Sequence, residues 1–266
     1  MKSRVHPLTG ALAIGTLAAL YAPLAAVAYL SVNANRHGFA WKGFSLKWYA
    51  GLLGNDAVRE AACNTLVLAV VSTLIATVLG TLLALAMARV PWPRGVRRLL
   101  DLLVYLPVVT PDILFAAALV VAFQILRGLS AAFNPGLLPM ILGHVAFQIA
   151  FVALVVGSRL ATLGRALDEA ARDLYATPLY LFRRVTLPLL APGIAAGAML
   201  AFTLSLDDFV ISFFTAGPQS TTLPLYIYAS LRRGISPEIH ALSTLIVLAT
   251  VVLVISLEAL TRFRRE

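Results

Sequence analysis

Three carboxylates lie inside long apolar runs of this 266-residue sequence: Asp112, Asp207 and Asp208. A charged side chain at the centre of a bilayer costs about 2.5–3.5 kcal/mol on insertion scales, so each aspartate needs a partner or a water-filled cavity. Pro107 and Pro111 break the helix beside Asp112, which frees carbonyl groups that are tolerated only against protein or water. A wet site lined by carboxylates is suited to a ligand that carries ammonium groups.

Helix geometry gives the expected depth of these carboxylates. At 1.5 Å per residue, Asp112 lies roughly 20 Å from Leu99, where its run begins, and Asp207 lies roughly 23 Å from Pro192. The two are therefore expected at similar depth on different spans. Neighbouring helical residues diverge by about 100°, so Asp207 and Asp208 face the same way only if the helix unwinds there.

Aromatic residues accompany the carboxylates along the same runs. Those that can stack on ammonium groups are Tyr105, Phe209, Phe213 and Phe214. Together with the aspartates they predict a pathway for a cation. The alternative is that the aspartates only cap loops at the outer interface of the membrane.

The sequence contains no set of residues for catalysis or for metal binding. None of its lysines (Lys2, Lys42 and Lys47) follows a glycine, so a Walker A loop is impossible. Neither H-E-x-x-H nor G-x-S-x-G occurs, and the single cysteine excludes a multi-cysteine metal site. The histidines His37, His144 and His240 stand at the edges of apolar runs and are interpreted as polar interface residues. If this protein is a pump, its motor is another chain.

Composition determines which elements must position these residues. Hydrophobic residues make up 60% of the chain and charged residues only 12%, against about 25% charged in an ordinary globular domain. A soluble core cannot hide so much apolar surface, which predicts an all-α integral membrane protein with a single domain over residues 1–266. Six runs reach the roughly 20 residues that a spanning helix needs, near residues 10–32, 61–88, 99–126, 139–161, 190–214 and 239–261.

The distribution of Lys and Arg predicts the orientation. Six spans place both termini on one side, and fourteen of the 21 basic residues lie on that side or in the loops that share it. The richer side is expected in the cytoplasm, so both termini are cytoplasmic. The net charge of +9 follows from this topology and does not indicate a nucleic-acid partner.

The first run has a second interpretation as a cleaved signal peptide, because "AVA" at 26–28 resembles a cleavage site. Its roughly 22 apolar residues exceed the usual 7–15 of a signal core, which favours a retained span. The loop from Asn33 to Glu60 is then outside. Its "FSLKWYAGLL" predicts a short amphipathic helix on the membrane surface.

The loop between the fourth and fifth spans, residues 162–189, is the least apolar long segment and faces the cytoplasm. Asp168 and Glu169 stand near the start of a predicted helix, where its dipole favours negative charge. Alanines leave one side thin enough for a helix-in-groove contact, and Pro178 is expected to divide the helix into two pieces. Apolar contacts to a partner are expected from Leu174, Leu179, Leu181 and Phe182. The alternative is an amphipathic helix that lies on lipid headgroups.

This segment resembles the EAA loop of the membrane-spanning subunits of ABC importers. That pattern is E-A-A, three residues, G, nine residues, I, one residue, L-P, and the spacing is kept here with Tyr175 in place of glycine and Val185 in place of isoleucine. Glycine permits a tight turn that tyrosine resists, so the loop is expected either to turn at Pro178 or to fit its partner differently. In that family the loop is a coupling helix in a groove of the ATPase subunit. The resemblance assigns coupling to Glu169, Ala170, Ala171, Asp173, Tyr175, Pro178, Leu187 and Pro188.

Further stretches are similar to the second permease of spermidine/putrescine importers: "FSLKWY", "NTL", "LPVVTPDI", "FTLSLDDFVISFFTAGP" and "TTLPLYIYASLRRGISPEIHALST". The resemblance implies a type I ABC importer permease of MetI-like architecture in a prokaryotic inner membrane. Its implied partners are a second permease in a heterodimer, two ATPase subunits, an extracytoplasmic binding protein and membrane lipid. ATP and Mg²⁺ would be held by the ATPase, with no cofactor on this chain.

The substrate that this resemblance implies is a polyamine. The pathway residues expected for it are Asp112, Asp207, Asp208, Trp48, Tyr105 and Phe209. One alternative is the same machine with another small cationic or zwitterionic solute. A gradient-driven secondary transporter would need an inverted repeat, which the sequence does not show, and a membrane scaffold leaves the carboxylates unexplained.

Overall fold

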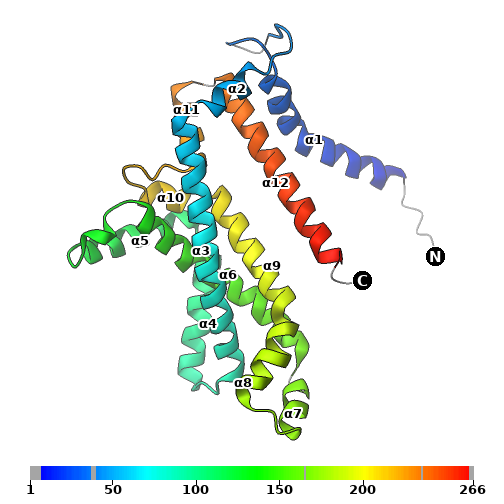
Figure 1. Ribbon diagram of the computed structural model, residues 1–266, viewed down its shortest axis with the longest axis vertical. Helices are drawn as coiled ribbons and strands as arrows, with labels where there is room; N and C mark the ends of the chain where they lie inside the picture. The colour runs from blue at the N-terminus through cyan, green and yellow to red at the C-terminus, as the bar shows by residue number, and fades with distance from the viewer. Residues whose placement is uncertain (1–6, 37–39, 165, 235, 264–266) are drawn as a thin grey trace. The chain divides into compact units, whose positions relative to one another are not determined.

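A computed structural model describes residues 7–36, 40–164, 166–234 and 236–263 of the chain. The chain divides into two compact units, one formed by Met1–Arg59 with Ile227–Glu266 and the other by Glu60–Tyr226. Within the described ranges the regular structure is helical, apart from one isolated β-bridge between Asn33 and Phe44 (Figure 1). The basic residues closest to the two chain ends, which contribute to the orientation prediction, lie outside the described residues.

The first unit is built on two long helices, α1 (Pro7–Ser31) and α12 (Pro237–Phe263), which pack against each other. The predicted short helix is present as α2 (Lys47–Leu53) and packs on α12. The loop before α2 is folded by side-chain hydrogen bonds, because Asn33 Oδ1 accepts from the N–H of Asn35 (3.1 Å) and of Lys42 (3.0 Å).

The second unit is organised around α6 (Leu137–Leu163), which packs against α4, α9 and α10. Its helices approach closely where glycine replaces a side chain. A Cβ on Gly80 would lie 2.7 Å from Val152 Cβ, and one on Gly193 would lie 2.7 Å from Arg159 Cβ. Small residues at such contacts are typical of membrane helix packing. The remaining elements of the unit are α3 (Asp56–Arg89), α4 (Arg94–Val109), α5 (Asp112–Arg127), η1 (Ala131–Phe133), α7 (Ala166–Asp173), α8 (Pro178–Tyr180), η2 (Leu181–Thr186), α9 (Leu187–Asp207), α10 (Val210–Thr215) and the start of α11 (Leu223–Arg233).

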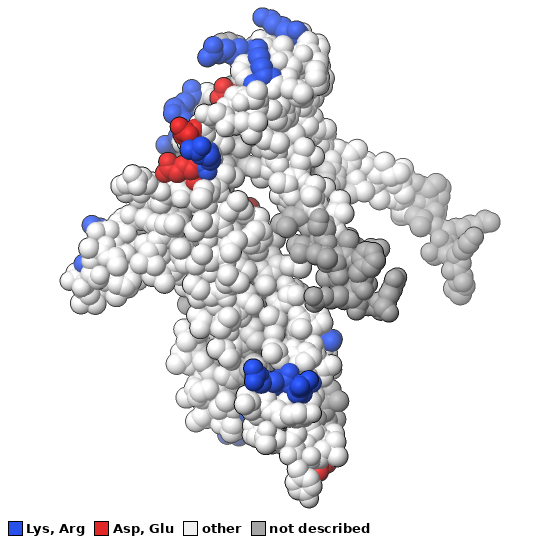
Figure 2. Space-filling model, in the orientation of Figure 1, with Lys and Arg blue, Asp and Glu red and all other residues white. Residues whose placement is uncertain are grey.

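All six predicted runs coincide with helices. Within the described ranges, four segments are long and apolar enough to cross a membrane: Leu8–Ser31, Asp56–Arg89, Leu137–Leu163 and Pro178–Asp207. A fifth is the pair α4 and α5, bent by 116° at their junction, and α12 adds the apolar stretch Pro237–Val252. On the face shown in Figure 2, the surface over α3, α4 and α9 is mostly free of charged side chains, as lipid or partner helices require.

The third predicted span is a broken helix, and only one of its two prolines breaks it. Thr110 has an extended backbone (φ −73°, ψ 133°) directly before Pro111, the conformation that a following proline favours. Pro107 was also expected to break the helix, but it is buried within α4. In a membrane bundle, neighbouring groups can compensate for the one hydrogen bond that an internal proline removes. The bend places Asp112 at the first residue of α5.

Candidate functional site

The predicted fifth span is interrupted at its two aspartates. Helix α9 ends at Asp207, Asp208 has an extended backbone (φ −62°, ψ 126°), and α10 begins at Val210. The helix therefore unwinds here, and the two carboxylates enter different surroundings. The Asp207 residue is exposed, whereas the Asp208 side chain is only 14% exposed.

Asp208 caps the N-terminus of α10. Its Oδ1 accepts from the Ile211 N–H (3.2 Å) and its Oδ2 accepts from the Ser212 N–H (2.8 Å). A carboxylate in this position satisfies amide groups that the helix itself leaves unpaired. This matches the capping role that the sequence left open, although the capped end lies at a break in the span rather than in an outer loop. Its part in a substrate pathway stays a prediction.

Asp112 and Asp207 are exposed carboxylates. Among the described residues, neither forms an ion pair. Asp112 lies in the first turn of α5, where the helix dipole stabilises negative charge, and α5 packs against α10. Two residues after Asp207, Phe209 stacks on Phe213 with ring centroids 5.4 Å apart. Two free carboxylates and a stacked aromatic pair can bind a cation by charge and by cation–π contact.

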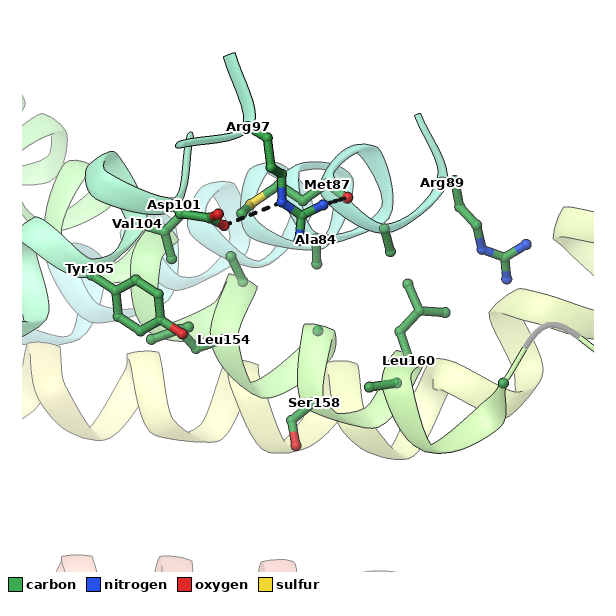
Figure 3. A pocket seen from close by; sticks show the side chains of 15 residues that line it. Ala84, Met87, Arg89, Arg97, Asp101, Val104, Tyr105, Leu154, Ser158 and Leu160 are labelled. Carbon is green, nitrogen blue, oxygen red and sulfur yellow. Dashed lines mark hydrogen bonds and ion pairs between the residues drawn. The ribbon is translucent and has the colours of Figure 1, made fainter. Parts of the chain in front are cut away.

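A cavity of about 610 Å³ lies between α3, α4 and α6, at the ends of these helices that are predicted to be cytoplasmic (Figure 3). Small residues line much of it, and Tyr105 and Arg89 lie toward opposite ends in the figure. Arg97 forms an ion pair with Asp101 (3.4 Å) and donates a hydrogen bond to the Met87 carbonyl. Tyr105 is thus the predicted pathway residue that the structure places in a cavity, whose volume suits a small solute.

The predicted coupling segment turns at Tyr175. The Ala176 N–H donates to the Ala171 carbonyl (3.0 Å), and Tyr175 adopts φ +59° in the left-handed region. This is the Schellman ending of a helix, in which glycine usually occupies the left-handed position. Of the two expectations for this position, a turn moved to Pro178 is therefore wrong, and a different fit to the partner stays a prediction. Pro178 is the first residue of α8, a position for which its fixed φ is suited, and Thr177 Oγ1 accepts from the Tyr180 N–H (3.4 Å).

The tip of this segment exposes apolar side chains. Leu174 is 82% and Tyr175 is 95% exposed, and Leu179 and Tyr180 are exposed as well. We call these four residues the tip patch. Leu181 was expected to contact a partner but is buried in its own chain, and Phe182 is half-buried. The other assigned coupling residues Glu169, Ala170, Asp173, Pro178, Leu187 and Pro188 are exposed, and Ala171 is half-buried.

Trp48 stabilises the loop between α1 and α2 in the first unit. Its Nε1–H donates to the Asn33 carbonyl (2.8 Å), and Lys47 Nζ lies 4.5 Å from the centre of its ring. The "NTL" stretch also has a structural role, in the second unit. Asn64 Nδ2 donates to the carbonyls of Gln219 and Thr221, both at 3.0 Å, so this stretch holds the loop between α10 and α11. The predicted pathway role of Trp48 stays a prediction.

The sequence did not reveal the importance of His144. It was interpreted as an interface residue, but it is 2% exposed and lies 2.8 Å from Ser205 Oγ, through Nδ1. His240 is half-buried in α12, and His37 lies outside the described residues. The signal in the sequence was weak, because His144 is one of several polar residues in the largely apolar α6, among them the equally buried Gln148. Among the described residues, no three His, Cys, Asp or Glu side chains are grouped to hold a metal ion.

Comparison with known proteins identifies the family. Residues 76–263 match the model of the binding-protein-dependent transport system inner membrane component family. The chain belongs to this family. It is homologous to permease subunits of polyamine ABC importers, and the resemblance drawn from the sequence is confirmed.

Two relatives illustrate this homology. The putrescine transport system permease protein PotI of Escherichia coli (strain K12) is 40% identical over 228 residues, which cover 85% of this chain and 81% of that protein. The spermidine/putrescine transport system permease protein PotC of the same strain is 36% identical over 255 residues, which cover 96% and 94%. This permease therefore matches polyamine permeases over most of its length.

Solved structures confirm the MetI-like permease fold. A crystal structure of a bacterial ABC transporter that imports the acidic polysaccharide alginate contains a chain with a TM-score of 0.74 at 23% identity, covering 97% of this permease and 95% of that chain. A second structure of the alginate transporter, in complex with an alginate pentasaccharide-bound periplasmic protein, gives a TM-score of 0.71. It is also 23% identical and covers 95% of this permease and 92% of that chain. At this identity the likeness establishes the fold.

Replacing Tyr175 with glycine should change coupling by no more than about threefold. A non-glycine residue in the left-handed region costs about 1–2 kcal/mol, and glycine recovers this but adds about 0.5–1 kcal/mol of unfolded-chain entropy. The turn is thus kept and slightly stabilised. The measurement is transport per ATP hydrolysed, with Ala176→Gly as the neighbouring control. Loss of ATPase assembly in Tyr175→Gly would instead show that docking depends on the tyrosine side chain.

Proposed function

We propose that this permease is one of two membrane-spanning subunits of an ATP-driven importer of polyamines such as spermidine and putrescine. The observation that carries the proposal is the pair of exposed carboxylates Asp112 and Asp207, which form no ion pair with the described part of the chain and lie at two breaks of the helices in a chain homologous to polyamine permeases. A polyamine carries several separated ammonium groups, and each needs an anionic counter-charge inside a membrane. Phe209 and Tyr105 would add cation–π contacts along its route.

The proposed machine contains a second permease, two ATPase subunits and an extracytoplasmic binding protein, in a prokaryotic inner membrane with both permease termini in the cytoplasm. The matched family is named for dependence on a binding protein, and the related alginate transporter has been solved with a periplasmic protein. ATP and Mg²⁺ would be bound by the ATPase subunits, since this sequence lacks a Walker A loop. This chain would supply the pathway and the coupling segment.

One helical segment would connect the motor to the pathway. Residues Pro178–Asp207 form a helical segment of 30 residues, which spans about 45 Å at 1.5 Å per residue. One end adjoins the tip patch and the other end carries Asp207. ATP binding would close the ATPase subunits and displace the coupling segment, and this continuous helical segment would carry the displacement to the carboxylate. Alternating access then follows from rocking of the permease pair, and ATP hydrolysis resets it.

The test is substrate-stimulated ATP hydrolysis by the complete complex in proteoliposomes. The substrates to compare are putrescine, spermidine, amino acids and phosphonates, each with the binding protein present. Stimulation by putrescine or spermidine alone is the expected result. Stimulation only by an amino acid or a phosphonate would assign the same machine to another small solute. Uptake that needs an ion gradient and no ATP would contradict the importer itself.

A further inference from the structure

His144 occupies the centre of a buried polar cluster at the break between α9 and α10. Its Nε2 lies 3.2 Å from Asp208 Oδ2 and 3.2 Å from Ser212 Oγ, and its Nδ1 lies 2.8 Å from Ser205 Oγ. Ser205 Oγ is in turn 3.3 Å from Ser72 Oγ on α3. The serines are almost fully buried. We call Ser72, His144, Ser205, Asp208 and Ser212 the anchor cluster.

The chemistry of each group determines which atoms of the anchor cluster donate hydrogen bonds and which accept them. An ionised Asp208 only accepts, so the hydrogen on His144 must be on Nε2. In the neutral ring, Nδ1 then accepts from the Ser205 hydroxyl. In the doubly protonated ring, Nδ1–H donates to Ser205, which can donate to Ser72 instead. The His144 Nε2–H donates to Asp208 in both protonation states of the ring, so this hydrogen bond does not depend on the charge of His144.

The anchor cluster joins four helices at one point: α3, α6, α9 and α10. Gly143 beside His144 lets α10 approach, because a Cβ there would lie 3.0 Å from Ile211 Cγ2. The residue preceding Asp208 is the exposed carboxylate Asp207. Two consecutive residues at an unwound break share a backbone, so a fixed Asp208 restricts where Asp207 can lie. His144 is the α6 residue of the cluster, so its hydrogen bonds connect α6 to the break.

We infer that His144 is a positioning residue for the substrate pathway. By donating to Asp208 it holds the α9–α10 break, and this directs the Asp207 carboxylate to the ammonium group of the substrate. Asp208 acts as the buried anchor and not as a ligand of the cation. The inference rests on the proposed function, because it needs Asp207 to meet a cationic substrate.

The test compares two substitutions of His144. A glutamine amide Nε2–H can replace the imidazole Nε2–H toward Asp208, whereas leucine has a similar size and no donor. We expect His144→Leu to transport about tenfold less polyamine per ATP hydrolysed, equivalent to about 1.4 kcal/mol, and His144→Gln to stay within about threefold of wild type. The measurement uses the reconstituted complex with saturating binding protein. A merely structural defect would lower ATP hydrolysis and assembly and would leave the transported amount per ATP unchanged.

A double-mutant cycle then tests whether His144 acts through Asp207. If it does, His144→Leu should reduce transport per ATP no further once Asp207→Asn is present, because coupled residues are not additive. A further tenfold loss in that background would overturn the inference. If His144→Leu does not assemble, His144→Asn replaces it, since its amide is too short to reach Asp208. Wild-type transport by Asp207→Asn alone would also overturn the inference, whereas wild-type transport by both Asp207→Asn and Asp112→Asn would contradict the proposed carboxylate pathway, so the two failures are distinguishable.

Discussion

Cells whose polyamine importer carries Asp207→Asn should take up labelled spermidine and putrescine at about a tenth or less of the wild-type rate. Asparagine preserves the size and the hydrogen-bonding capacity of aspartate and removes its charge. Hydrogen bonds to charged groups contribute about 1.5–3 kcal/mol, which corresponds to roughly 10- to 100-fold. Asp207 is exposed, and no described residue forms an ion pair with it, so the substrate is the available counter-charge.

Asp112→Asn should have an effect of the same order. Its carboxylate is also exposed and outside any ion pair of the described residues, at the first residue of α5 beside the bend. Removing one partner of a dry buried pair costs about 3–5 kcal/mol, and hydration of the pathway lowers that figure. Membrane insertion and assembly with the ATPase should be unchanged, because neither side chain contributes a described salt bridge to the fold.

Asp56→Asn is the matched control. Asp56 forms a salt bridge with Arg59 (2.9 Å), but both side chains are largely exposed, and such pairs contribute about 0–1 kcal/mol. Its uptake should equal that of wild type at matched expression. Asp208→Asn is not a control, because its carboxylate caps α10 and contacts His144. Normal uptake by both Asp112→Asn and Asp207→Asn would contradict the carboxylate pathway and indicate an uncharged or anionic substrate.

The positions of the breaks were accessible from the sequence because they follow from local rules. A proline removes an N–H and restricts the preceding residue, so a break near Pro111 was predictable. The sequence predicted the unwinding at Asp208 only conditionally. Adjacent residues diverge on a helix, so Asp207 and Asp208 could face the same way only if the helix unwound there. The 116° angle between α4 and α5 was not predictable, because it depends on how α5 packs against α10.

Contacts between distant residues explain what the sequence concealed. His144 contacts Ser205 and Ser212, which lie 61 and 68 positions further along the chain, so its burial depends on the packing of α6 against α9 and α10. Tyr175 shows the opposite error. The local rule that tyrosine disfavours the left-handed region is correct. The hydrogen bonds that end the helix nevertheless impose this conformation on Tyr175. The prediction for Leu181 was wrong because the sequence does not distinguish an apolar residue that packs on a partner from one that packs within its own chain.

Glu169→Lys should separate the permease from its ATPase and reduce transport at least tenfold. The resemblance to the EAA loop implies that Glu169 lies in the groove of the ATPase subunit, and like charges brought together at an interface cost several kcal/mol. Glu169 is exposed in α7, and surface substitutions usually change stability by no more than about 0.5 kcal/mol. The permease should therefore remain folded and inserted. The measurement is co-purification of the ATPase, together with polyamine uptake.

Glu60→Lys is the matched control, because it makes the same charge reversal on an exposed residue of α3, at the end predicted to be extracytoplasmic. It should retain the ATPase. Glu169→Gln removes the charge without reversing it and should have a smaller effect, which separates repulsion from lost attraction. If Glu169→Lys retains its ATPase and transports normally, the coupling hypothesis fails. The exposed side chains of the tip patch would then be explained by contact with lipid headgroups, and the helix from Pro178 to Asp207 would have no motor at its end.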